Sequence, residues 1–267
     1  MDIVFCETRW HYQSYTDYWR LVELAGFERV YLDELEPSRR AIYIVSPRNG
    51  ELPPVLDRLQ GDHACKFVWW CLERPDAQGS VTESRALEDG IDELWLSDRW
   101  LANLHRSKSW GPVRYVTLGS HRELGQPGDQ ARFDWAHLSY AVPRRQGIYD
   151  FIGGRMLPNC WDGERDEGLR GTRVMLNVHQ DEWLVIEPLR WALAATYALH
   201  LVSERVHDPY PLRPGVEFVM GGYETLIQVT QSFMGLPNSD YGPKLRDRLT
   251  RQFEFGSCVK EAACLLS

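Results

Sequence analysis

The sequence lacks any pair of cysteines spaced Cys-x-x-Cys, although six cysteines occur among its 267 residues. Their spacing fits neither a disulfide framework nor a zinc site, and it indicates free thiols in a reducing compartment. A long apolar run is also missing, because Glu187, Pro188 and Arg190 interrupt the longest one, at 183–202. That run cannot cross a bilayer cheaply. The opening residues, MDIVFCETRW, are typical of a strand and not of a signal peptide. We therefore expect a cytoplasmic protein with no membrane span.

An excess of positive charge is missing as well. The formal net charge is -8, which leaves no electrostatic footprint for nucleic acid and disfavours non-specific binding of polyanions. With 43% hydrophobic and 25% charged residues, the chain has the composition of a globular protein. Its length allows one large domain or two lobes.

Short apolar runs alternate with segments of helical periodicity, and this alternation predicts βαβ units and parallel sheets. In the first half of the chain, strands are expected at 3–6, 29–32, 41–45, 66–71, 93–97 and 114–118. Helices are expected between them at 15–24, 52–59, 82–88 and 99–105. This series makes up a complete Rossmann-like lobe.

Loop residues then separate this lobe from a second series of elements. Gly-Gln-Pro-Gly-Asp-Gln stands at 125–130 and Pro-Arg-Arg at 143–145, so the lobe boundary is expected there. The second series has expected strands at 149–152, 173–179, 199–204 and 216–220 and helices at 165–169, 187–198 and 223–234. The predicted organisation is an N-terminal acceptor lobe at 1–122, a linker at 123–147, a C-terminal donor lobe at 148–240 and C-terminal helices at 241–267.

The predicted fold class is α/β, with two Rossmann-like lobes and an interlobe cleft. Ligands of such open sheets bind at the carboxyl ends of the strands, and polar residues gather at those ends in this sequence. For Thr8 and the Ser97-Asp98 pair, a helix cap or a solvated loop is the favoured interpretation. Of the tryptophans, Trp69, Trp70, Trp95 and Trp191 are expected in the core, whereas Trp10, Trp161 and Trp183 are candidates for stacking on a ligand.

The segment VMLNVHQDEWLVIEPLRWALAATYALHLVSE, at 174–204, is more specific. It resembles the donor-binding half of retaining glycosyltransferases with the two-lobed GT-B fold, the group known as glycosyltransferase group 1 or CgeB-like. The resemblance implies that Glu187 binds the donor sugar as the first Glu of an E-x7-E type motif. Leu193 and Ala194 stand where the second Glu is expected, so Glu204 is the candidate for the ribose. Independently of the family, the free N–H groups of a helix that begins near Glu187 suit a diphosphate.

Two further stretches carry the resemblance. YDFIGGRMLPN, at 149–159, is similar to the first strand and glycine loop of the donor lobe, which implies that Arg155 binds the donor phosphates. The family often adds a Lys, but 156–243 contains none, so Arg165, Arg170 or Arg173 would substitute. In the N-terminal lobe, KFVWWCLERPD, DELWLSDRWLA and VRYVTLGSH resemble strands of CgeB-like proteins.

The resemblance implies a hexosyltransferase type of glycosyltransferase that moves a sugar from a nucleoside diphosphate sugar, UDP-sugar above all, to a hydroxyl acceptor. Retention of configuration and independence of metal are implied with it, and no convincing D-x-D sequence is present. No bound cofactor is expected. The expected catalytic residues are His179, Glu187 and Arg155. The expected donor-binding residues are Asn177, Gly153, Gly154, Pro188, Arg190 and Glu204. The expected acceptor-side residues are Glu7, His11, Glu73 and His121.

Other functions stay open at this point. A DNA glycosyltransferase acting on hydroxymethylated bases is kept in view by Arg144-Arg145 and by the basic stretch at 244–251. The missing second Glu would suit a non-catalytic sugar-nucleotide-binding protein, and a nucleotide-sugar epimerase would share the architecture. A dinucleotide oxidoreductase is disfavoured, because Cys6-Glu7-Thr8-Arg9 follows the first strand in place of G-x-G-x-x-G.

Overall fold

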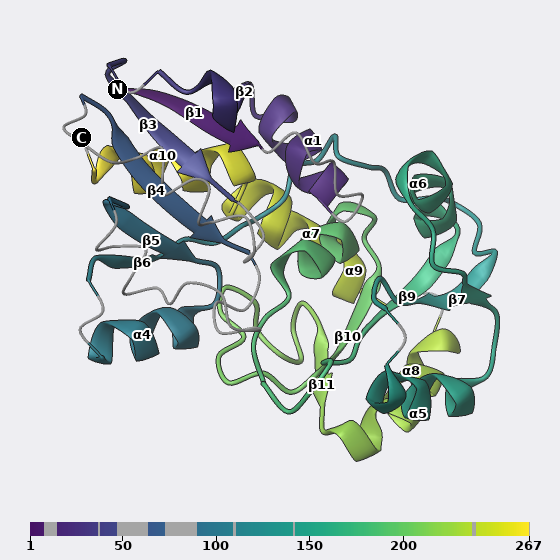
Figure 1. The fold of residues 1–267 in the computed structure, drawn as a ribbon. Helices are drawn as coiled ribbons and strands as arrows, with labels where there is room; N and C mark the ends of the chain where they lie inside the picture. The colour runs from purple at the N-terminus through teal and green to yellow at the C-terminus, as the bar shows by residue number, and fades with distance from the viewer. Residues whose placement is uncertain are drawn as a thin grey trace. The chain divides into compact units, whose positions relative to one another are not determined.

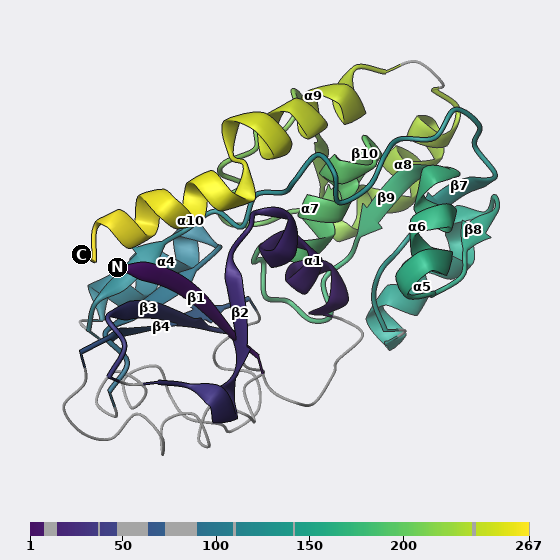
Figure 2. The same cartoon turned by 90° about the horizontal axis from the view of Figure 1, so that it is seen from above.

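The computed structural model describes residues 1–7, 15–36, 38–46, 64–72, 90–108, 111–140, 142–236 and 239–266. Two compact units make up the chain. The first lobe is Met1–Leu118 together with Phe255–Ser267, and the second lobe is Gly119–Glu254. Each lobe contains a parallel sheet with helices (Figures 1 and 2). The predicted α/β fold with two Rossmann-like lobes is therefore confirmed. No helix in the described part of the chain is long and apolar enough to cross a membrane.

The first lobe contains a six-stranded sheet in the order β2-β1-β3-β4-β5-β6, and every pairing in it is parallel. Its strands are β1 (Asp2–Glu7), β2 (Glu28–Tyr31), β3 (Ala41–Val45), β4 (Lys66–Cys71), β5 (Glu93–Leu96) and β6 (Val113–Tyr115). Its helices are α1 (Thr16–Leu24), the short η2 (Leu32–Glu34), α4 (Arg99–Ser107) and α10 (Phe255–Cys264). The six predicted strands are confirmed, and the expected helices at 52–59 and 82–88 lie outside the described residues.

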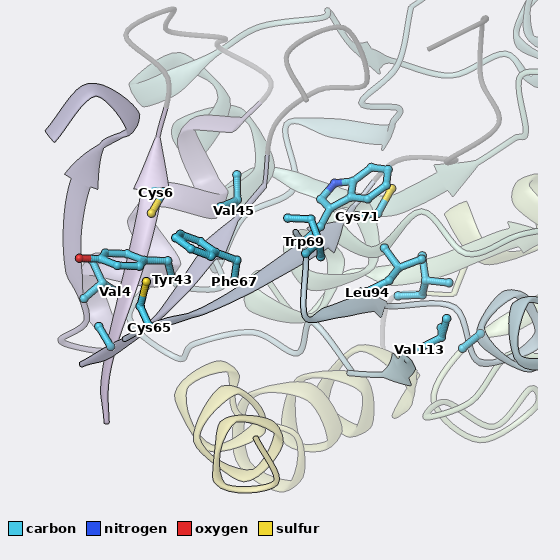
Figure 3. Close-up of a cluster of buried hydrophobic side chains, with 14 of the residues drawn as sticks. Val4, Cys6, Tyr43, Val45, Cys65, Phe67, Trp69, Cys71, Leu94 and Val113 are labelled. Atoms are coloured by element: carbon cyan, nitrogen blue, oxygen red, sulfur yellow. The ribbon is translucent and has the colours of Figure 1, made fainter. Parts of the chain in front are cut away.

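The strands of this sheet are apolar at successive positions. This pattern is typical of a sheet whose two faces are both buried. In β4, Phe67, Trp69 and Cys71 belong to one apolar cluster with residues of β1, β3 and β5, and Figure 3 shows this cluster along the sheet. Trp70 points to the opposite face, where its ring stacks on Phe255 of α10 at 5.8 Å between centroids. This packing makes the C-terminal helix α10 part of the first lobe. The predictions of core positions for Trp69, Trp70 and Trp95 are confirmed.

The second lobe contains a five-stranded parallel sheet in the order β11-β10-β9-β7-β8. Its strands are β7 (Phe133–Ala136), β8 (Met156–Leu157), β9 (Thr172–Asn177), β10 (His200–Glu204) and β11 (Val219–Gly221). Its helices are α5 (Pro143–Ile152), α6 (Asp162–Arg170), α7 (Pro188–Thr196), η4 (Tyr223–Thr225), α8 (Leu226–Met234), α9 (Tyr241–Asp247) and the π-helical turn η5 (Arg248–Gln252). α5 and α8 pack together over one apolar cluster of the sheet, whereas α7 packs against α9 and η5.

The strand predicted at 149–152 is wrong, because these residues form the last turn of α5. Pro143 occupies the first turn of that helix, a position where its missing N–H and fixed φ suit a helix. The buried residues of α5 are Arg145, Ile148, Tyr149 and Ile152, and that spacing is the i, i+3, i+4, i+7 repeat of an amphipathic helix. The apolar residues on the buried side of this helix account for the strand-like pattern at 149–152.

The expected linker at 123–147 is not a linker throughout, since it contains β7, which pairs with both β8 and β9. The chain instead passes between the lobes after Leu118 and again after Glu254. The tail at 241–267 is helical as expected, but its helices are divided: α9 and η5 belong to the second lobe and α10 to the first.

Gly242 lets α9 approach the end of α7 closely. A Cβ added there would lie 1.9 Å from the carbonyl oxygen of Ala198, and a backbone atom cannot move aside as a flexible side chain does. We expect Gly242→Ala to lower the free energy of unfolding by about 1–3 kcal/mol, the usual effect of overpacking, as measured by chemical denaturation. Gly163→Ala in α6 is the matched control, because nothing lies within 4 Å of its added Cβ. Equal effects of the two substitutions would contradict this account of the α7–α9 contact.

Candidate functional site

Three strands of the second lobe end beside one another at one edge of its sheet. β7, β9 and β10 are parallel neighbours, so their carboxyl ends meet there, where such sheets bind ligands. α5 follows β7 and α7 follows β9, so both helices begin at this edge. The polar residues that the folding brings together here are His137, Arg144, Arg145, Asn177, His179, Glu187, Arg190 and Glu204. We refer to them as the strand-end cluster.

Arg144 and Glu204 form a two-pronged ion pair that ties the start of α5 to the end of β10. Nη1 of Arg144 donates to Oε2 of Glu204 at 2.7 Å, and Nη2 donates to Oε1. The Glu204 carboxylate is buried, and its hydrogen bond with Arg144 raises the pKa of the arginine. The guanidinium also lies 4.3 Å from the ring centroid of Tyr223. Because Glu204 is paired in this way, it holds the start of α5 in position, and its expected contact with the ribose stays a prediction.

Arg190 connects α7 to the ends of two strands. Its Nη1 donates to Oδ1 of Asn177 at 2.8 Å and also to Glu187, while its Nε donates to the carbonyl of Leu138 at 3.0 Å. Asn177 is buried and donates in turn to Ser203 on β10 at 3.1 Å. Arg190 is therefore in direct contact with the other two sequence-predicted residues, Asn177 and Glu187.

Arg145 completes the cationic part of the cluster. Its Nη2 lies 3.2 Å from Oε1 of Glu187, and its Nε donates to the carbonyl of Val178 at 2.8 Å. Burial, and then the neighbouring Arg190, lower the pKa of Arg145, but a guanidinium stays charged in proteins. Glu187 is held between the two arginines and makes no side-chain cap to its own helix. The interpretation of Glu187 as a simple helix cap is thereby excluded.

His179 is buried, and its backbone connects Glu204 with Arg144. Its backbone N–H donates to Oε2 of Glu204 at 3.0 Å, and its carbonyl accepts from Arg144 at 3.1 Å. Its Nε2 lies 3.1 Å from the carbonyl of Arg205, so Nε2 must carry the hydrogen, since a carbonyl only accepts. The imidazole that was expected to contact the donor is therefore engaged within the lobe.

The cluster has the charge and the donors of an anion site. Three arginines stand against two carboxylates, which leaves one net positive charge in a chain of net charge -8. Both helices that begin here carry proline at the first position, Pro143 and Pro188. In α7 the amide of Arg190 donates to the carbonyl of Glu187 at 3.2 Å. First-turn amides that have no intrahelical acceptor form the positive end of the helix dipole and suit an anion. This combination is suited to phosphate oxygens.

Gly153, Gly154 and Arg155 lie elsewhere, which corrects their expected position. Because they follow α5 and precede β8, they sit at the amino edge of the sheet, opposite the strand-end cluster. Arg155 is 65% exposed and its Nε lies 3.5 Å from Asp134 at the start of β7. The expected position was wrong because it depended on a strand at 149–152. These residues belong to α5, so the glycine turn after them lies at the amino edge of the sheet and not at the carboxyl edge.

Of the four expected acceptor-side residues, the structure describes one in each lobe, Glu7 and His121. Glu7, at the end of β1, is buried and paired with Arg29 of β2. His121 belongs to the second lobe and follows Ser120, which contacts Ala192 and Thr196 on α7. His11, Glu73 and Trp10 lie outside the described residues. Asp98 caps α4 by accepting a hydrogen bond from the amide of Leu101 at 2.8 Å. This confirms the interpretation of Asp98 as a helix cap.

The basic residues on which the DNA glycosyltransferase hypothesis depends form ion pairs and hydrogen bonds within the second lobe. Arg144 and Arg145 pair with Glu204 and Glu187 as described. Among the cations of 244–251, Lys244 pairs with Asp240 and Arg251 with Asp247, while Arg246 and Arg248 donate to backbone carbonyls. Within the described residues, no group of three His, Cys, Asp or Glu side chains is placed to hold a metal ion.

No family model matches the sequence, and no curated protein sequence matches it. Solved structures do match the fold. Anabaena Alr3699/HepE in complex with UDP and glucose matches with a TM-score of 0.64 at 9% identity, over 100% of this chain and 99% of that one. The apo form of the lipopolysaccharide outer core galactosyltransferase WaaB matches with 0.61 at 8% identity, over 100% of both chains. TarM matches with 0.62 at 10% identity, over 92% of this chain and 57% of TarM.

The fold is GT-B-like. At these identities the likeness concerns the fold alone, and UDP and glucose are ligands of HepE. In this GT-B-like chain, the site itself rests on the geometry of the strand-end cluster. The sequence predicts five members of the cluster, because each lies at the end of a strongly patterned strand or at the start of the helix that follows: Asn177, His179, Glu187, Arg190 and Glu204. It did not assign His137, Arg144 and Arg145 to the site, although Pro143 before the arginines signals a helix start.

The pair of Arg144 and Glu204 provides a stability test of the cluster. We expect Glu204→Ala to lower the free energy of unfolding by about 3 kcal/mol, because it leaves a part-buried guanidinium without its counter-charge. The double variant Arg144→Met, Glu204→Leu should recover part of that loss, since both charges are gone. Glu167→Ala breaks the exposed pair with Arg132 and should cost no more than about 1 kcal/mol. Similar losses for Glu204→Ala and Glu167→Ala would contradict the importance of the buried pair.

His137 provides a pH test. Burial, and then Arg190, lower its pKa from 6.5 to about 4, so between these pH values the unfolded chain binds a proton that the folded chain does not. The stability from the neutral ring is complete above pH 6.5 and is lost as the pH falls toward 4. We expect the Tm of His137→Phe to fall less steeply than that of the unchanged protein over this window. Parallel Tm profiles would contradict the depressed pKa.

Proposed function

We propose that this chain is a glycosyltransferase that takes a sugar from a nucleoside diphosphate sugar and transfers it to a hydroxyl acceptor. The observation that carries the proposal is the strand-end cluster. Arg144, Arg145 and Arg190 converge with two helix starts at the carboxyl edge of the second sheet, a position suited to a diphosphate. The GT-B-like fold supports it, since WaaB is a galactosyltransferase and HepE binds UDP and glucose.

The arginines have a direct chemical role in this reaction. As the glycosidic bond to the diphosphate breaks, negative charge grows on the leaving phosphate, and fixed cations and amides stabilise it without reorganisation. Arg190 is held in position by Asn177, Glu187 and the carbonyl of Leu138. Arg145 is buried with all its donor nitrogens bonded within the lobe, so it contributes positive charge and not a direct contact. Both carboxylate oxygens of Glu187 are paired with arginines, but its side chain is 26% exposed, which leaves part of it accessible to a sugar.

The remaining residues act through these. Glu204 and His179 fix the start of α5, and Asn177 fixes Arg190. Pro188 sets the direction in which α7 begins. We place the donor as a UDP-sugar, and the enzyme as a metal-independent, retaining hexosyltransferase of the CgeB-like group acting in the cytoplasm. The cations alone supply the leaving-group stabilisation that a metal ion provides elsewhere, and the departing phosphate can take the acceptor proton.

Binding of UDP, measured by calorimetry, tests the assignment of the arginines. We expect Arg190→Met to weaken UDP binding about 10- to 100-fold, the value of a hydrogen bond to a charged group. Arg155→Met should leave the affinity unchanged, because Arg155 lies at the opposite edge of the sheet. Arg132→Met, which also removes a surface arginine of this lobe, controls for overall charge. Loss of binding with Arg155→Met and not with Arg190→Met would transfer the site to the glycine turn.

Glu187→Gln separates donor binding from transfer. Removing this negative charge from beside two arginines should leave UDP bound at least as tightly, because the anion meets less repulsion. The rate of UDP release from UDP-sugar should nevertheless fall about 10- to 100-fold, if a carboxylate on the sugar contributes more than one strong hydrogen bond in the transition state. An unchanged rate would remove Glu187 from the reaction. A protein that binds UDP-sugar and never releases UDP, with any acceptor, would be a binding protein and not an enzyme.

A further inference from the structure

The helix α8 carries no charged residue, although it lies on the surface of the second lobe. Charged residues make up 25% of the chain, but 225–239 contains no Asp, Glu, Lys or Arg. The exposed side chains of α8 are instead Gln228, Gln231 and Ser232. The outer face of a surface helix normally carries charged residues. An outer face without charge is typical of a protein interface, whose centre is depleted of charged side chains.

α8 and α5 form one continuous surface. Tyr223, just before α8, donates from its hydroxyl to the carbonyl of Arg144 at the start of α5, at 2.7 Å. Further along, Nε2 of Gln231 donates to the carbonyls of Phe151 and Ile152 at 3.3 and 3.0 Å. The two helices therefore lie side by side from the start of α5 to its end (Figure 1).

Exposed apolar side chains gather at the end of this surface. Phe151, the next-to-last residue of α5, is 69% exposed, and Leu236, just after α8, is 48% exposed. Met156 of β8 is 40% exposed and is paired with Trp135 of β7. Trp135 packs in the apolar cluster beneath α5 and α8, and paired residues point to the same face of a sheet. Met156 thus lies on the side that these helices cover. We call the following exposed residues the α5–α8 face: Phe151, Met156, Gln228, Gln231, Ser232 and Leu236.

The charge of this face differs from that of the whole chain. Its own side chains are uncharged, and the exposed charges beside Phe151 and Met156 are of opposite sign, Asp150 and Arg155. The chain as a whole has a net charge of -8, so two copies repel one another over most of their surfaces. At the α5–α8 face this repulsion is smallest, and a strongly charged partner would find no counter-charge there.

We propose that the α5–α8 face is the contact surface between two copies of this chain, related by a two-fold axis. A two-fold axis places the same residues of both copies opposite one another. Apolar groups such as Phe151 suit this arrangement, and so do glutamine amides, because each amide carries donors and an acceptor and can bond to its own counterpart. Two short helices make a face at the small end of specific interfaces, so we expect the dimer to dissociate in the micromolar range.

Sedimentation velocity of the full chain over a range of concentrations tests the inference. We expect a monomer that becomes a dimer as the concentration rises through the micromolar range. Raising NaCl from about 0.1 M to about 1 M should tighten the dimer, because salt screens the repulsion between two acidic chains. A dimer held by ion pairs would be weakened by the same change, and that result would contradict an uncharged interface.

Two variants locate the interface. Phe151→Asp puts a charge in the apolar part of the face, and Gln228→Glu puts one on α8 with almost no change in size. Each should weaken the dimer at least about tenfold, because the two-fold axis doubles every added charge. Leu265→Asp is the matched control, since Leu265 is 68% exposed but belongs to the first lobe. It should leave the dimer intact. Since all three positions are exposed or on an outer face, the Tm of each variant should stay close to that of the unchanged protein.

Three results would overturn the inference. The first is an unchanged protein that stays monomeric at every concentration and both salt levels, which would leave the face to a partner of another kind. The second is a dimer that survives both Phe151→Asp and Gln228→Glu. The third is a dimer that Leu265→Asp weakens as much as Phe151→Asp does, because general charge and not this face would then control association.

Discussion

The candidate site depends on one constraint: three guanidinium groups have to be held close together at the edge of a sheet. Two carboxylates make this possible. Glu204 pairs with Arg144, and Glu187 lies between Arg145 and Arg190. Without these partners the arginines would repel one another and turn toward water. Buried ion pairs of this kind contribute little net stability, because desolvation offsets their attraction, but they fix geometry. Their main consequence here is the position of two helix starts.

The same arrangement explains how an acidic protein can offer an anion site. The overall charge of -8 is spread over the chain, whereas the strand-end cluster keeps one unbalanced positive charge. Each arginine is bound to strand ends or backbone carbonyls, as in the contacts of Arg190 with Asn177 and Leu138. Donors that are already oriented stabilise a developing negative charge without having to reorganise. Net charge argues against non-specific polyanion binding, but it could not reveal the local site.

The sequence predicted the fold well where strands are buried on both sides. The bounds of continuous apolar runs such as Ala41–Val45 and Lys66–Cys71 can be predicted from the sequence alone, without knowing what packs against them. It failed at α5, because the inward side of that helix includes Arg145, a charged residue that a search for apolar periodicity passes over. The error moved the glycine turn, and Arg155 with it, to the wrong edge of the sheet. Residues such as Asn177 were found because their strand and the helix after it are unambiguous. His137 was missed because β7 lies in the stretch 123–147, whose glycine and proline residues indicate a loop.

A crystal structure of the protein with UDP bound tests the central claim most directly, because the claim concerns where a diphosphate lies. We predict that the phosphate oxygens are within hydrogen-bonding distance of the guanidinium of Arg190, at the carboxyl edge of the second sheet. A diphosphate found instead at Gly153, Gly154 and Arg155 would contradict the account. So would a strand-end cluster that stays closed by its own side chains while UDP binds elsewhere.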